Sequence, residues 1–226
     1  MMRSTVRDVM TTDVVTVRAD TPFKEIARVL ATSRISGVPV VNADGTVVGV
    51  VSEADLLPKE EFKTLTDEYP RLGRRAAKAA RAKAGGDTAA ELMSTPAVTI
   101  APDAPVAEAA RMLAERGIKR LPVVAGGRLV GIVTRADVLG VFLKSDAQIS
   151  KLVIEEVVKR CLWEDPEFVS VHVKDGVVTL GGRLELKSLI PIAVRLTAAI
   201  DGVVDVVDRL AYVQDDTTPE YQRYWR

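Results

Sequence analysis

An internal repeat is the feature of this sequence that most constrains its fold. Shifting the chain by 83 residues aligns 8–41 with 91–124, and 15 of those 34 positions are identical. Shifting it by 82 residues aligns 48–57 with 130–139, with six of ten positions identical. The lost residue falls between the aligned blocks, where a turn is expected, and surface turns tolerate length changes that strands do not. The sequence therefore predicts one structural unit that is present twice.

Both copies predict the same order of elements. Asp20-Thr21-Pro22 and Asp103-Ala104-Pro105 are typical of helix starts, because proline needs no N–H partner in the first turn. Apolar residues follow at helical spacing, and then come two short β runs around a turn and a second, short helix. A small sheet of this kind cannot bury both faces alone, so we expect the two copies to pack against each other. The predicted strands are 38–41, 47–51, 121–124 and 129–133.

A hydroxyl and a carboxylate recur at the start of the second helix of each copy. These residues are Ser52 and Asp55 in the first copy and Thr134 and Asp137 in the second. Such a corner can hold a ligand, because helix N–H groups and the hydroxyl bind phosphate while the carboxylate accepts hydrogen bonds from a diol. The same spacing also forms a capping box that only stabilises the helix start. The residues alone leave both interpretations open.

The order of motifs in each copy resembles a CBS domain, and the tandem pair resembles a Bateman module over about 6–57 and 89–143. The resemblance rests on Met-(Thr/Ser)-Thr, the helix, Gly-Val-Pro-Val-Val or Arg-Leu-Pro-Val-Val, and Ser-x-x-Asp or Thr-x-x-Asp. It implies a mixed α/β and α+β fold, with two pseudo-symmetric βαββα-type units packed as a pair around two clefts. In that family the clefts often bind AMP, ADP, ATP or S-adenosylmethionine as regulatory ligands, not as cofactors. Such pairs commonly dimerise, so we also expect a homodimer.

The resemblance also implies which residues form the nucleotide-binding clefts. Asp55 and Asp137 would hold ribose hydroxyls, with Ser52 and Thr134 beside the phosphates. The backbone around six further positions would line the adenine slots. These positions are Thr16, Val38, Pro39, Thr99, Leu121 and Pro122.

Two basic residues distinguish the copies. Lys119 and Arg120 precede the first strand of the second copy, where the family often carries basic residues that contact phosphate. The first copy has Ser36 and Gly37 at the equivalent positions. We therefore expect unequal clefts, with the cleft that contains Asp137 as the occupied one.

The segment 58–88 separates the copies and contains a basic stretch at 71–84, with six basic residues and no acidic one. Its alanines favour helix. It is either a basic arm for nucleic acid or nucleotide phosphates, or a solvated helical linker. No aromatic residue is interleaved within 71–84, which makes nucleic acid the less favoured partner.

The residues after the repeat predict a small αββαβ domain over 145–213. Its order and its Asp-Gly-Val-Val-Thr-Leu-Gly-Gly motif resemble the BON domain, a family linked to phospholipid or membrane surfaces. The domain contains 8 basic and 11 acidic residues, so it does not attract anionic lipid, and a protein partner is equally well supported. A tail, 214–226, follows with three aromatic residues near its end, typical of a segment that seeks a partner surface or folds back. The expected helices are 146–161 and 186–200, and the expected strands are 168–173, 177–180 and 202–210.

Composition excludes several classes of function. The 31 basic and 31 acidic residues give no overall attraction to nucleic acid or membranes. Cys161 and His172 are single, so neither a zinc site nor a Ser/His/Asp triad is indicated, and we expect a protein that is not an enzyme. The N-terminus lacks the apolar core of a signal peptide, and no run approaches the roughly 20 apolar residues that span a bilayer. These features predict a cytoplasmic protein.

The sequence therefore favours a regulatory protein that binds an adenine nucleotide in the CBS clefts and signals through the BON-like domain. The alternative is a scaffold whose clefts are purely structural and whose BON-like domain docks to a membrane surface or a protein partner.

Overall fold

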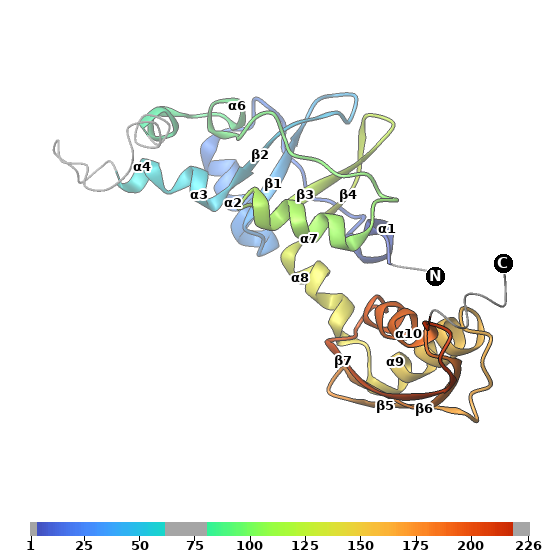
Figure 1. Cartoon of the computed structure of the whole chain (residues 1–226). Helices are drawn as coiled ribbons and strands as arrows, with labels where there is room; N and C mark the ends of the chain where they lie inside the picture. The colour runs from blue at the N-terminus through green and yellow to red at the C-terminus, as the bar shows by residue number, and fades with distance from the viewer. Residues whose placement is uncertain (1–3, 62–80, 219–226) are drawn as a thin grey trace. The chain divides into compact units, whose positions relative to one another are not determined.

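The computed structural model describes residues 4–61 and 81–218 and divides the chain into two units (Figure 1). The N-terminal unit, Thr5–Arg135, holds nearly all of both copies of the repeat. The C-terminal unit is Ala136–Arg226 together with Met1–Ser4. Within the described ranges, no helix is long and apolar enough to cross a membrane. The aromatic residues of the tail and most of the basic stretch, 71–80, lie outside the described residues.

Each copy in the N-terminal unit contains an antiparallel hairpin between helices. The first copy consists of α1 (Val6–Val9), α2 (Phe23–Ser33), β1 (Gly37–Val41), β2 (Val47–Ser52), α3 (Glu53–Leu56) and α4 (Pro58–Glu61). The second copy begins with α6 (Ala89–Leu92), α7 (Val106–Glu115), β3 (Arg120–Ala125) and β4 (Arg128–Thr134). Both hairpins shift register at equivalent places, after Val40 in β1 and after Val123 in β3. The two copies thus share even the position at which the pairing of their strands is irregular.

The long helix of each copy buries the apolar stripe that its sequence predicts. In α2, Ile26 and Leu30 are buried, and their counterparts Ala109 and Leu113 are buried in α7. The proline stands at the N-cap position, one residue before each helix, and not inside the first turn. A proline in the first turn and a proline at the N-cap are both compatible with helix initiation, because the residue lacks an N–H group that would need a partner.

The segment that opens each copy crosses over to the hairpin of the other copy. Ser94 exchanges two backbone hydrogen bonds with Val50 of β2, at 2.9 and 3.2 Å. Thr11 does the same with Ile132 of β4, at 2.9 Å for both bonds. Each hairpin therefore gains backbone partners from the opposite copy, and the two copies form one interlocked body.

Two methionines strengthen this exchange. Met93 lies against Gly49 of β2, and Met10 lies against Gly131 of β4, so a Cβ atom at either glycine would overlap the methionine side chain. Leu92 of α6 also belongs to the buried cluster of the first copy. The hydrophobic core of each hairpin thus depends on residues from the other copy's opening segment.

The C-terminal unit places helices on one face of a three-stranded sheet (Figure 1). α8 (Arg135–Leu139) leads into it from the N-terminal unit. In the sheet, β6 pairs antiparallel with β5 and parallel with β7. Its core includes Ile149, Val153, Leu180 and Leu184. The remaining elements are η1 (Gly140–Leu143), α9 (Asp146–Leu152), η2 (Val153–Lys159), β5 (Val169–Lys174), β6 (Val177–Leu186), α10 (Leu189–Ala198) and β7 (Asp205–Gln214).

The expected elements of this unit differ from the observed ones in three main places. One is β7, which was expected over 202–210 and spans Asp205–Gln214. The helix expected over 146–161 is α-helical only in α9, and η2 is a π-helix. Its backbone bonds reach five residues back, since the N–H groups of Arg160 and Leu162 donate to the carbonyls of Glu155 and Val157. β6 is also longer than expected and shortens α10, because its last residues pair with β7.

Candidate functional site

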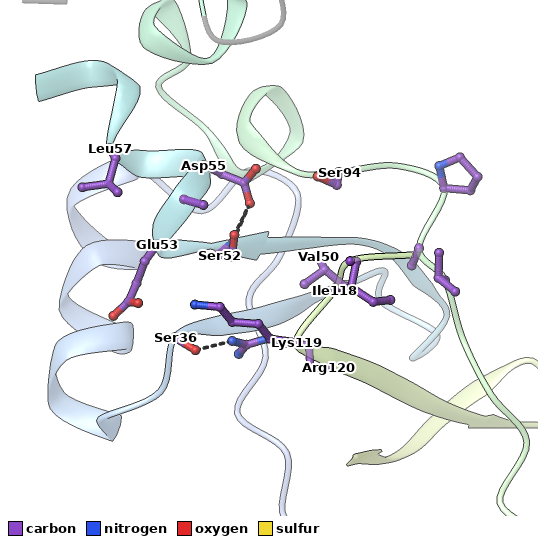
Figure 2. Close-up of a pocket in the computed structure, with 15 residues that line it drawn as sticks. Ser36, Val50, Ser52, Glu53, Asp55, Leu57, Ser94, Ile118, Lys119 and Arg120 are labelled. Atoms are coloured by element: carbon purple, nitrogen blue, oxygen red, sulfur yellow. Dashed lines mark hydrogen bonds between the residues drawn. The ribbon is translucent and has the colours of Figure 1, made fainter. Parts of the chain in front are cut away.

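A pocket of about 340 Å³ lies in the N-terminal unit where the two copies meet (Figure 2). The corner between β2 and α3 forms one part of its wall, and the residues that lead into β3 form another. The loop after α6 completes it. The volume is within the range of small-molecule sites. The lining residues are Ser36, Val50, Ser52, Glu53, Ala54, Asp55, Leu57, Ser94, Pro96, Ala97, Val98, Gly117, Ile118, Lys119 and Arg120.

Asp55 provides the acceptor at one end of the pocket. The residue is buried, with 8% of its surface exposed. Its Oδ2 accepts hydrogen bonds from the N–H and the hydroxyl of Ser52, both at 2.7 Å, and its Oδ1 accepts one from the ammonium group of Lys83. Ser52 and Asp55 therefore form the capping box, while the carboxylate still lines the pocket. The capping role and a ligand-binding role are compatible.

Lys119 and Arg120 provide positive charge at the other end of the pocket (Figure 2). The Arg120 guanidinium is buried and donates to the carbonyl of Gly37 and the hydroxyl of Ser36. Burial lowers the pKa of Arg120, and the nearby charge of Glu53 opposes that change. Arginine nevertheless stays protonated in proteins, so the pocket retains a fixed cation here. Lys119 is exposed.

Small apolar side chains line much of the space between these ends. Val50 comes from β2, Ala97 and Val98 come from the loop after α6, and Ile118 precedes β3. Flat apolar walls of this kind suit an aromatic ring, while the polar ends fix its orientation. The pocket thus joins a carboxylate, an apolar wall and two cations in one place.

The structure brings four of the twelve predicted residues into this pocket: Ser52, Asp55, Lys119 and Arg120. Val38 and Leu121 are completely buried in the core. Their neighbours Pro39 and Pro122 do not line the pocket, and their carbonyls accept hydrogen bonds from the backbone N–H groups of Val17 and Ile100. Thr16 and Thr99 are half-buried outside the lining, although Val98, one residue before Thr99, does line it.

The charged residues meet in a different cleft from the one that the sequence analysis favoured. We expected Lys119 and Arg120 to mark the cleft of Asp137, but both line the pocket that contains Asp55. The reason is that the Arg120 side chain extends to Ser36 and Gly37 of the first copy. Asp137 lies in the part of α8 that is assigned to the C-terminal unit. A cleft at Asp137 stays a prediction.

The sequence interpretation missed most of the pocket wall. Val50 follows the alternation of β2, but nothing in the sequence showed that the loop with Ser94 and Val98 would pack beside it. The sequence analysis named Ser36 only because the second copy has a basic residue at the equivalent position. In the structure the Ser36 hydroxyl accepts a hydrogen bond from the Arg120 guanidinium. The contrast between the small Ser36 in one copy and the large Arg120 in the other could have indicated that the two residues contact each other.

The described residues offer no alternative chemistry at this site. Residues 4–61 and 81–218 contain no group of three or more His, Cys, Asp or Glu side chains that could hold a metal ion. Cys161 is exposed in the C-terminal unit, and His172 is exposed on β5. The pocket itself presents a hydrogen-bond acceptor, Asp55, and positive charge, Lys119 and Arg120.

Comparisons with known proteins identify the domains. The CBS domain family matches residues 6–59 and 89–144, and the BON domain family matches residues 145–214. MJ1426, an uncharacterized protein of Methanocaldococcus jannaschii, is 30% identical over 149 residues, covering 59% of this chain and 88% of that protein. MJ1404, an uncharacterized protein of the same organism, is 32% identical over 149 residues, covering 62% of this chain and 32% of that protein.

A solved structure is similar to the same part of the chain. The crystal structure of CBSX2 in complex with AMP is 29% identical, with a TM-score of 0.53, and covers 60% of this chain and 94% of that one. CBSX2 is a protein of Arabidopsis thaliana. The chain therefore belongs to the CBS domain family, with a tandem CBS pair followed by a BON domain. It spans about a third of MJ1404, and neither matching family is a catalytic one.

Proposed function

We propose that this protein is an adenine-nucleotide sensor and that the pocket with Asp55, Lys119 and Arg120 is its nucleotide site. The observation that carries the proposal is the set of groups that line one pocket: a carboxylate, an apolar wall and two cations. A nucleoside monophosphate carries a complementary set of groups: a ribose diol for the carboxylate, a purine for the apolar wall and a phosphate for the cations. AMP in complex with the similar protein CBSX2 supports this choice of ligand.

Each pocket residue has a distinct role in this proposal. Asp55 accepts a hydrogen bond from a ribose hydroxyl, and Val50, Val98 and Ile118 contact the purine. Lys119 approaches the phosphate as an exposed point charge. Arg120 uses N–H groups that its bonds to Ser36 and Gly37 do not occupy, because a guanidinium carries five N–H donors.

The balance of charge favours a monophosphate over a triphosphate. Glu53 and Asp55 carry two negative charges in the lining, and Lys119 and Arg120 carry two positive ones. Adding a triphosphate would leave several negative charges without partners, whereas a monophosphate adds at most two. We therefore expect AMP to bind most tightly, ADP less tightly and ATP least tightly. S-adenosylmethionine, with no phosphate, tests how much the cations contribute.

Isothermal titration with these four ligands tests the proposal. We expect AMP to bind the wild-type protein, and Lys119→Ala to weaken AMP about tenfold, the equivalent of about 1.4 kcal/mol, while leaving adenosine unchanged. Lys24→Ala is the matched control, because Lys24 is an exposed lysine on α2 of the same unit. Absence of binding by all four ligands would contradict the proposal.

The C-terminal unit supports a second role, docking to a partner that receives the signal. It exposes large apolar side chains, with Trp163 at 89%, Phe168 at 61% and Val204 at 63%. Exposed rings of this size are typical of contact surfaces. Co-sedimentation with neutral and anionic vesicles, using wild type and Trp163→Ser, tests a lipid surface, and pelleting without a difference between the variants would count against it. The homodimer and the cytoplasmic location stay predictions, which light scattering and fractionation can check.

A further inference from the structure

The acceptor positions of Asp55 are almost fully occupied by the protein itself. A carboxylate offers about four acceptor positions on its two oxygens. Ser52 uses two positions on Oδ2 through its N–H and its hydroxyl. The ammonium group of Lys83 uses a position on Oδ1. A ribose diol needs two acceptors, and these bonds leave it one.

Lys83 comes from the segment between the two CBS domains. Residues 81–85 are helical, and the Lys83 ammonium group also reaches the hydroxyl of Ser94 at 3.3 Å. Both of its partners line the pocket, whereas Lys83 itself does not. The pair is shielded from solvent, with 22% of the Lys83 side chain and 11% of the Asp55 side chain exposed. The lysine thus approaches the pocket wall from behind and neutralises its carboxylate.

A second lysine fixes the end of the same segment elsewhere. Lys59 of α4 donates to the carbonyl of Gly86 at 2.7 Å and to the carboxylate of Asp87 at 2.6 Å. Its ammonium group lies 4.9 Å from the centroid of the Phe23 ring. Because these contacts do not involve the pocket, release of Lys83 would remove the side-chain tie of residues 81–85 to the pocket wall while residues 86–87 remain anchored.

We propose that Lys83 is a built-in competitor for the ligand's vicinal diol. A ribonucleotide displaces the Lys83 ammonium group from Asp55, and binding therefore releases the 81–85 helix from the pocket wall. This inference rests on the proposed nucleotide site. It gives residues 81–85 a role as the element that responds to ligand, and it makes Lys83 a determinant of affinity that does not itself contact the bound nucleotide.

Calorimetry with Lys83 variants tests this competition. We expect Lys83→Met to bind AMP about five- to tenfold more tightly than wild type, because the ligand no longer displaces a charge-assisted hydrogen bond. The gain should be smaller for 2′-deoxy-AMP, which offers one hydroxyl in place of two. Lys83→Arg should retain wild-type affinity because it keeps the ion pair. Lys59→Met is the matched control and should leave AMP affinity unchanged.

A measurement on the lysine itself gives the second readout. Acylation of lysine side chains, followed by mass spectrometry, should show Lys83 becoming more reactive when AMP is added to the full-length protein, with Lys59 unchanged. Weaker or unchanged AMP binding by Lys83→Met would overturn the competition while leaving the proposed site intact. Absence of binding by both wild type and Lys83→Met would overturn the proposed site as well, whereas binding only by the variant would support the competition.

Discussion

The two CBS domains differ most where they touch. At equivalent positions where the first strand begins, the first domain has Ser36 and Gly37 and the second has Lys119 and Arg120. The structure shows that Arg120 is the partner of both residues of the first domain, since it donates to the carbonyl of Gly37 and the hydroxyl of Ser36. The two copies have therefore diverged into complementary halves of one site. The small residues of the first copy provide space and acceptors for the charge of the second.

The helix-start carboxylates extend this difference. Asp55 shares a pocket with Lys119 and Arg120 inside the N-terminal unit, whereas Asp137 lies in α8 of the C-terminal unit. The sequence pattern around these two residues is nearly the same, yet only Asp55 lines the described pocket. A duplicated motif thus need not give two equal sites, and the following predictions address this asymmetry from the largest expected effect to the smallest.

Gly37→Val should be the most destabilising change. A Cβ atom at Gly37 would lie 2.8 Å from the carbonyl oxygen of Val51 and 2.9 Å from Cζ of Arg120. The carbonyl belongs to the paired strand and cannot move aside, and the buried guanidinium would lose its partners. We expect a loss of about 3 kcal/mol in the free energy of unfolding, measured by denaturant titration.

Gly85→Ala is the control for this change, because nothing lies within 4 Å of a Cβ atom there. It should be neutral or slightly stabilising. If Gly37→Val unfolds at the same denaturant concentration as wild type, the close contact of Gly37 with Val51 and Arg120 is contradicted.

Gly49→Ala and Gly131→Ala test the contact between a strand glycine and a methionine of the other copy, which is the same in both copies. Each should cost about 1–2 kcal/mol, because the new methyl group displaces Met93 or Met10. Gly131→Ala should cost slightly more, since its Cβ would also lie 3.1 Å from the backbone oxygen of Thr11. Thermal unfolding measures both.

Replacing the facing methionine sharpens this test. Met93→Ala should offset part of the cost of Gly49→Ala in the double variant, because the overlap is relieved. Strictly additive losses would show that the methionine is not what fills the space above the glycine.

The smallest effect concerns a helix cap that the copies share. Asp8 accepts hydrogen bonds from the N–H and the hydroxyl of Thr5, and the equivalent Glu91 accepts from the N–H groups of Asp87 and Thr88. These bonds lower the pKa of Glu91 below its ordinary value of 4.5. A lowered pKa in the folded state adds stability above about pH 4.5 that disappears as the pH falls through the folded value.

Glu91→Gln should therefore lower the melting temperature slightly at pH 7 and have no effect well below pH 4. The difference in melting temperature between variant and wild type, measured from pH 7 to below pH 4, checks the direction of the effect. A difference that grows on acidification would contradict it.

The fold was largely predictable from the sequence, because duplication made the pattern visible twice. The apolar stripe of α2 and α7 and the strands around Pro39 and Pro122 follow from local spacing. The exchange of opening segments did not, since nothing local to Met10 or Met93 shows which hairpin it will cover. The π-helix after α9 was also missed, because Val153, Val157 and Val158 fit an apolar stripe in either type of helix.

The candidate site was predictable in its chemistry but not in its grouping. Ser52 and Asp55 were found from their spacing, and Lys119 and Arg120 from the resemblance to the CBS family. Their meeting in one pocket depends on the direction of a single side chain, that of Arg120, toward the other domain. Lys83 belongs to the basic stretch 71–84, but the sequence did not show that its ammonium group would pair with Asp55.

The most direct test of this account compares two substitutions at equivalent positions. The AMP affinity of Asp55→Asn and of Asp137→Asn is measured by calorimetry against wild type, with thermal unfolding to confirm that both variants fold. The account predicts that Asp55→Asn weakens AMP about tenfold or more, while Asp137→Asn changes it less than about twofold. The reverse order would contradict the assignment of the nucleotide to the pocket shared by Asp55, Lys119 and Arg120.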